Sequence, residues 1–210
     1  MNIASNPNEP TFVLLLGSYD SDTKNLLDAI KQKIAETYAG EGVYAILLDE
    51  VELYDTKECF VLVERWSKEN VSVHIFLHDG ELEESYELNV TEEAPIDEAV
   101  KDLLQKEYGI TDVTKVTIFD KLGLLTKATR SILLVRDKEE TRGGEIAELI
   151  YCIMMGYSSK VCMFKREGFD FSSMLMEFLD QLKVIIRTYR DRNGLIECVL
   201  RFLSYRMTEK

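Results

Sequence analysis

The chain contains 210 residues, of which 46% are apolar, and it carries a formal net charge of −13 at pH 7. This length suffices for one large domain with a buried core. The acidic balance argues against general nucleic-acid binding, because neutralising phosphates requires a basic face. No apolar run approaches the ~18 residues of a membrane-spanning helix, so we expect no membrane partner.

The N-terminus and the cysteines point to a cytoplasmic protein. Residues 1–10 are polar and lack the apolar region of a signal peptide, so we expect a flexible lead-in there. The cysteines form no Cys-x-x-Cys pair, and three of the four lie in apolar runs, as small core residues do. They are Cys59, Cys152, Cys162 and Cys198. A reducing compartment and no metal site fit this usage best.

Short apolar runs alternate with helical patterns through most of the chain. The runs expected to form parallel strands are residues 11–16, 43–48, 116–119, 130–136 and 161–164. Helices are expected at about 23–38, 96–108, 122–129, 144–156, 171–187 and 195–205. This alternation predicts an α/β fold with a flavodoxin-like doubly wound five-stranded parallel sheet of strand order 2-1-3-4-5.

A different pattern occupies the middle of the chain. Residues 59–65, 71–78 and 85–90 are β-rich, and Asp79-Gly80 between the last two is a strong hairpin signal. We expect an antiparallel β-meander inserted at about 57–92. The chain would then be a single α/β domain over 11–210, with C-terminal helices at 171–208.

Polar residues follow the predicted parallel strands, and the carboxyl ends of such strands form the ligand-binding edge of an α/β sheet. This edge would gather Gly17-Ser18-Tyr19-Asp20, Asp137, the segment 142–148 and Lys165. The chain has neither a Gly-x-Gly-x-x-Gly nor a Gly-x-x-x-x-Gly-Lys motif, so a dinucleotide or P-loop site is not supported and we expect no cofactor. Glutamates in the first turns of a helix are favoured as anions by the helix dipole.

Part of this edge resembles the nucleoside 2-deoxyribosyltransferase family. Gly144-Glu145-Ile146-Ala147-Glu148 opens a helix that contains Tyr151 and is followed by Gly156 and a strand at 161–164. In the family signature, a glycine and three further residues precede the nucleophilic glutamate. The opening strand with Gly17-Ser18-Tyr19 is also similar to the family's. Related nucleotide hydrolases and TIR-like domains share this frame, and the resemblance covers about half the chain.

The resemblance implies Glu148 as nucleophile, positioned by Tyr19. Where the family has an aspartate, two residues before the glycine, this chain has Arg142; Asp137 or Glu145 would have to replace it. Arg142 instead suits a phosphate, which favours a nucleotide over a nucleoside. The predicted substrate-binding residues are Gly17, Ser18, Asp20, Asp137, Arg142, Gly143, Gly144 and Lys165.

Helix phase leaves the choice between the two glutamates open. At ~100° per residue, the apolar face of the helix centres on Ile146, Ile150 and Ile153. Glu145 then lies at the margin of that face and Glu148 nearly opposite it. Phase therefore favours Glu145 as a catalytic residue, whereas the spacing of the signature favours Glu148.

Two functions of different classes follow. The first is an enzyme that cleaves or transfers the N-glycosidic bond of a nucleoside or nucleotide through a glutamate nucleophile. The alternative is a non-catalytic nucleotide-sensing or protein-interaction module on the same fold. Charge adds a partner hypothesis, because residues 1–110 carry 24 acidic and 8 basic side chains, whereas residues 111–210 carry 14 and 17. The basic C-terminal part is either a solvated surface or the contact of a homodimer with the acidic half of a second copy.

Overall fold

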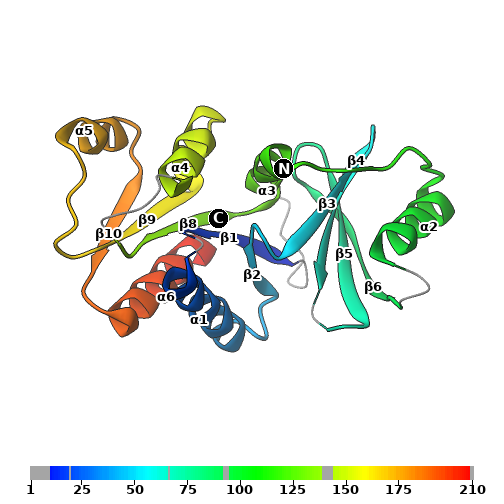
Figure 1. Cartoon of the computed structure of the whole chain (residues 1–210), viewed down its shortest axis with the longest axis horizontal. Helices are drawn as coiled ribbons and strands as arrows, with labels where there is room; N and C mark the ends of the chain where they lie inside the picture. The colour runs from blue at the N-terminus through cyan, green and yellow to red at the C-terminus, as the bar shows by residue number, and fades with distance from the viewer. Residues whose placement is uncertain (1–9, 19, 66, 92–94, 139–143, 209–210) are drawn as a thin grey trace. The chain divides into compact units, whose positions relative to one another are not determined.

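The computed structural model describes residues 10–18, 20–65, 67–91, 95–138 and 144–208 (Figure 1). The chain forms two compact units, one from residues 1–47 and 129–210 and the other from residues 48–128. Over the described residues the first unit contains a five-stranded parallel sheet and the second a five-stranded antiparallel sheet, so the predicted mixed α/β class is confirmed. Apart from Pro10, the lead-in predicted for residues 1–10 lies outside the described residues.

The parallel sheet has the order β2-β1-β8-β9-β10. Its strands are β1 (Thr11–Gly17), β2 (Val43–Leu47), β8 (Ser131–Arg136), β9 (Val161–Arg166) and β10 (Ile185–Tyr189). The interior strand β1 pairs Leu15 with Leu47 of β2 on one side and with Leu133 of β8 on the other. From Phe12 onward it is buried throughout, as a strand covered on both faces must be.

Helices cover both faces of this sheet (Figure 1). They are α1 (Ser21–Thr37), α4 (Gly144–Met154), α5 (Ser173–Gln181) and α6 (Arg192–Thr208), with a 3₁₀ turn, η1 (Ser158–Lys160). α1 and α6 pack side by side on one face, where Leu27, Ile30 and Phe202 join a single core with the sheet. α4 packs against β1 and β8 and lies on the opposite face (Figure 1).

One predicted strand and the last part of one predicted helix are wrong. Residues 116–119 form no strand of the parallel sheet: β7 (Thr114–Lys115) pairs antiparallel with β3 (Val51–Asp55), and α3 begins at Ile118. The helix predicted for 171–187 stops at Gln181, and its last part forms β10. Lys183 explains the break, because its positive φ of 56° lies outside the helical region.

The second unit confirms the antiparallel meander and extends it. β4 (Cys59–Arg65), β5 (Asn70–Leu77) and β6 (Leu82–Asn89) pair in sequence, and β3 and β7 enlarge the sheet to the order β6-β5-β4-β3-β7. Helix α2 (Ile96–Tyr108) buries Val100 and Leu104 in one core with these strands. Helix α3 (Ile118–Ala128) ends the unit.

Candidate functional site

The first group of predicted site residues lies where β1 ends and α1 begins. Asp20 caps α1, because its Oδ1 accepts hydrogen bonds from the backbone N–H groups of Asp22 and Thr23, both at 3.2 Å. The Nζ atom of Lys138, just beyond β8, donates to the same oxygen at 2.7 Å. This hydrogen bond is the main reason that the pKa of Asp20 lies well below its usual range. Asp20 therefore joins two loops of the sheet edge as a carboxylate.

Gly17 has a packing role at the same edge. A Cβ atom at this position would lie 3.1 Å from the carbonyl oxygen of Val135 and 3.3 Å from Leu27. β8 and α1 both pack closely against the end of β1, so a larger residue in place of Gly17 would displace them. The Ser18 hydroxyl donates a hydrogen bond to Asp20, while Tyr19 lies outside the described residues.

The second group lies in the first turns of α4. The Glu145 side chain is 2% exposed, and its Oε1 is 3.7 Å from Nη1 of Arg136, the last residue of β8. Glu148 follows one helical turn later. Glu145 Oε1 and Glu148 Oε2 are both buried, and neither accepts a hydrogen bond within the described part of the chain. Buried polar atoms normally have such a partner, so these two oxygens mark a candidate site.

The environment of Glu148 brings its titration into the neutral range. Burial, followed by the negative charge of Glu145, raises the pKa of Glu148 to about 7. Near pH 7 the group therefore exists in both protonation states. Cys152 lies one turn further on, and burial with the charge of Glu148 raises its pKa to about 12, so its thiol stays protonated.

The phase predicted for α4 is right only in part. Its buried residues are Glu145, Leu149, Cys152 and Ile153, so Ile153 is buried as expected, whereas Ile146 and Ile150 are half-buried. Hydropathy had placed the isoleucines at the centre of the buried face. The side chain that faces the sheet in the first turn is instead a glutamate, because Arg136 at the end of β8 offers it a cation.

Two cations lie close to the ring of Phe171, and one of them is the partner of Glu145. The guanidinium carbon of Arg136 lies 4.7 Å from the ring centroid of Phe171, and Lys165 Nζ lies 5.9 Å from it. Lys165 also donates a hydrogen bond to the carbonyl oxygen of Phe169 at 2.8 Å and lies 3.6 Å from Oδ1 of Asp170. Lys165, predicted to bind substrate, is thus engaged with the segment that follows β9.

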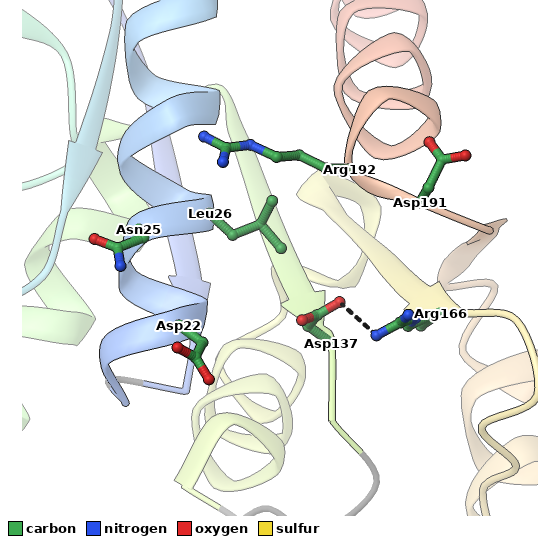
Figure 2. A pocket seen from close by; sticks show the side chains of 7 residues that line it. All are labelled: Asp22, Asn25, Leu26, Asp137, Arg166, Asp191 and Arg192. Carbon is green, nitrogen blue, oxygen red and sulfur yellow. Dashed lines mark ion pairs between the residues drawn. The ribbon is translucent and has the colours of Figure 1, made fainter.

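Asp137 lies in a different place, a pocket of about 290 Å³ shown in Figure 2. The pocket is lined by Asp22, Asn25, Leu26, Asp137, Arg166, Asp191 and Arg192. Asp137 Oδ1 accepts a hydrogen bond from the Tyr189 hydroxyl at 2.9 Å and lies 4.0 Å from Nη1 of Arg166. Burial, then the hydrogen bond to Asp137, raises the pKa of Tyr189, so its hydroxyl remains a donor.

The structure therefore brings some predicted site residues together and separates others. Glu145 and Glu148 share one cluster, but neither lines the pocket that contains Asp137. Gly144 is the exposed first residue of α4, and a Cβ there would meet no atom within 4 Å. Arg142 and Gly143 lie outside the described residues.

Sequence reasoning missed Arg136 and Phe171. Arg136 could have been found, because it continues the alternation of Ile132 and Leu134 along β8 onto one face of the sheet. Phe171 carries no comparable signal, since it lies between β9 and α5 and meets Arg136 only in the folded chain.

Among the described residues, no group of three or more His, Cys, Asp or Glu side chains could hold a metal ion. None of the helices described is both long and apolar enough to cross a membrane.

Comparison with known proteins gives no relative from which a function could be transferred. The chain matches no protein-family model, no curated protein and no solved structure. The functional interpretation therefore depends on the geometry above and on the resemblance of the α4 segment.

Proposed function

We propose that the protein cleaves or transfers the N-glycosidic bond of a nucleoside or nucleotide, in the manner of the nucleoside 2-deoxyribosyltransferases that it resembles. One observation carries the proposal. Glu145, which is buried, and Glu148, which is half-buried, form a pair of carboxyl groups at the start of α4, and each has a buried oxygen that accepts no hydrogen bond from the described residues. A bound substrate would supply the polar partner that each of these oxygens lacks within the described residues.

In this reaction the ionised Glu148 attacks the anomeric carbon of the sugar. The C–N bond breaks as the C–O bond to Glu148 forms, and the base leaves with the electron pair of the broken bond. Water or a second base then attacks the same carbon and releases Glu148 as a carboxylate, and the proton that the attacking group loses balances the proton that the departed base takes up. A pKa of about 7 keeps Glu148 partly ionised at neutral pH. Glu145, beside Arg136, would stabilise positive charge that develops on the sugar.

We also infer that the parallel sheet belongs to the flavodoxin-like group. Numbered by themselves along the chain, its strands β2-β1-β8-β9-β10 have the order 2-1-3-4-5. The order reverses between β1 and β8, and α/β sheets of this kind bind ligands at the carboxyl ends of the strands beside such a reversal. Glu145 is ion-paired with the last residue of β8, which is consistent with a ligand at this edge.

A second candidate function is a non-catalytic nucleotide-binding module. The pocket in Figure 2 offers it a location, because Arg166 and Arg192 line this pocket and neither glutamate does, although three aspartates, Asp22, Asp137 and Asp191, line it as well. Guanidinium groups bind phosphate oxygens well, and binding alone would need no nucleophile. Arg142 in place of the aspartate of the resembled family favours the same alternative.

Release of free base decides between the two functions. The protein is incubated with a panel of nucleosides and nucleotides, and the products are separated by chromatography. Glu148→Gln and Glu145→Gln are tested beside Glu197→Gln, which removes an exposed carboxylate from α6. We expect base release from the wild type and the Glu197 variant, and at least a 100-fold loss in Glu148→Gln, since removal of a catalytic nucleophile can cost up to ~10⁶-fold in rate. Thermal stabilisation by a nucleotide without base release would favour the binding module.

A further inference from the structure

Arg136 is the described residue whose position best accounts for the buried charge of Glu145. Its side chain is 13% exposed, which is low for an arginine. Its Nη1 atom lies 3.7 Å from Oε1 of Glu145, and its guanidinium carbon lies 4.7 Å from the ring centroid of Phe171. The aromatic face limits where the guanidinium can move, so the ion pair with Glu145 is held in place.

The other charged groups around the pair make Arg136 the relevant cation. α4 packs against β1, β8 and η1. β1 contains no titratable side chain, and Lys160 of η1 donates its hydrogen bond to the carbonyl oxygen of Thr129. Lys165 of β9 is directed to Phe169 and Asp170, and Cys152 of α4 is a protonated thiol. Among the ion pairs described, Arg136 is therefore the partner of Glu145.

We propose that Arg136, held against the face of Phe171, is a positioning residue that keeps Glu145 as a fixed carboxylate, so that Glu148 alone is left to react. The part of this inference that concerns the reaction of Glu148 rests on the proposed function. The part that concerns the effect of Arg136 on Glu145 does not. Two carboxyl groups one turn apart, one buried and one half-buried, would otherwise share protons, because like charges in a poorly solvated site cannot both persist without a counter-charge. The positive charge of Arg136 stabilises the ionised form of Glu145, so the shared proton stays on Glu148.

The test follows the two carboxyl groups directly. The protein is labelled with ¹³C at glutamate carboxyl carbons, and the Glu145 and Glu148 signals are followed by NMR from about pH 4 to about pH 9, a range that brackets the ordinary glutamate value. Arg136→Met removes the charge while keeping a long apolar chain on Phe171. Arg136→Lys restores a charge, and Arg201→Met removes an exposed arginine from α6 as the control.

We expect ionisation of the pair to move upward by roughly one to three pH units in Arg136→Met, because a cation within ~4–6 Å favours the ionised carboxyl by that amount. In Arg136→Lys the carboxyl groups should titrate close to their wild-type pH range, because a positive charge is kept. The carboxyl groups of Arg201→Met should titrate like those of the wild type. Phe171→Leu, which keeps the arginine but removes its aromatic support, should shift in the same direction by less. It provides an independent test should Arg136→Met fail to fold.

The outcomes separate this inference from the proposed function. An unshifted titration in Arg136→Met, or an equal shift in Arg201→Met, would overturn the role of Arg136 whatever the activity. Absence of base release from the wild type, with the expected NMR shift present, would count against the proposed reaction and leave the electrostatic role of Arg136 standing. If both hold, the pH profile of base release in Arg136→Met should move with the NMR titration.

Discussion

Glu145 and Glu148 lie one turn apart on α4, and the negative charge of Glu145 adds to burial in raising the pKa of Glu148 to about 7. The two carboxyl groups therefore differ in their surroundings although they share a helix face. Glu145 has Arg136 beside it, whereas no ion pair of Glu148 is found among the described residues. Paired carboxyl groups in unlike environments are a common basis for dividing chemical roles.

The pH dependence of base release should reveal the role of Glu148. Because its pKa is about 7, a nucleophilic Glu148 is inactive when protonated at lower pH and active when ionised at higher pH. We expect the single-turnover rate to rise with pH through a midpoint near 7. A rate that instead falls through the same midpoint would identify Glu148 as a proton donor and contradict its assignment as nucleophile.

The same group should make stability depend on pH. The pKa of Glu148 is raised from 4.5 to about 7 in the folded protein, so the folded state binds the proton more tightly than the unfolded state. This contribution is fully present below pH 4.5 and is lost as pH rises through 7, at a cost on the order of 3 kcal/mol.

We expect Glu148→Gln to remove this dependence and to raise the free energy of unfolding above pH 7 relative to the wild type. Urea denaturation of both proteins between about pH 5 and about pH 8, where stability is usually greatest, would measure the difference. Parallel stability curves for the two proteins across this range would contradict the prediction.

Asp20 should contribute to stability through the N-terminus of α1. Asp20→Ala removes the cap of the helix and the partner of Lys138, and we expect a loss of about 1 kcal/mol in the free energy of unfolding. Because the pKa of Asp20 is lowered, its contribution is present at neutral pH and decreases as acid protonates the carboxylate. Asp28→Ala, at an exposed position of the same helix, is the matched control and should change stability little.

Gly80 should be intolerant of a side chain. It has φ +97° in the hairpin between β5 and β6, and a Cβ atom there would lie 2.5 Å from the carbonyl oxygen of Lys127, in the same unit. We expect Gly80→Ala to cost more than about 1 kcal/mol, since both the backbone conformation and the contact oppose it. Gly40→Ala, whose Cβ would meet no atom within 4 Å, should cost less in the same denaturation assay.

Hydrophobic patterning predicts most of the fold, and its failures have local causes. Buried strands such as β1 stand out because both of their faces are apolar. β10 was missed because Leu182, Ile185 and Ile186 continue the helical spacing of α5, and nothing in the sequence marks the left-handed Lys183 that ends the helix. The four residues 116–119 are too few for periodicity to distinguish a strand from the start of α3.

The candidate site was predictable only in part. The position of Glu145 and Glu148 at the start of α4 follows from the order of strand, loop and helix. The full burial of Glu145 does not, because hydropathy places this glutamate no further in than the margin of the buried face of the helix unless its cation is known. That cation is Arg136, and its own position depends on Phe171, 35 residues later in the chain. Such contacts arise from tertiary packing and leave no local pattern.

The division of the first unit into residues 1–47 and 129–210 has a consequence for how the protein folds. β1 pairs with β8, and Val13 lies opposite Ser131 in this pairing. The centre of the parallel sheet therefore cannot form until β8 has been synthesised. The antiparallel unit is continuous and joins β4, β5 and β6 through short turns, so its contacts are local and should form faster. During synthesis we therefore expect the middle of the chain to fold before its N-terminal strand finds its neighbour.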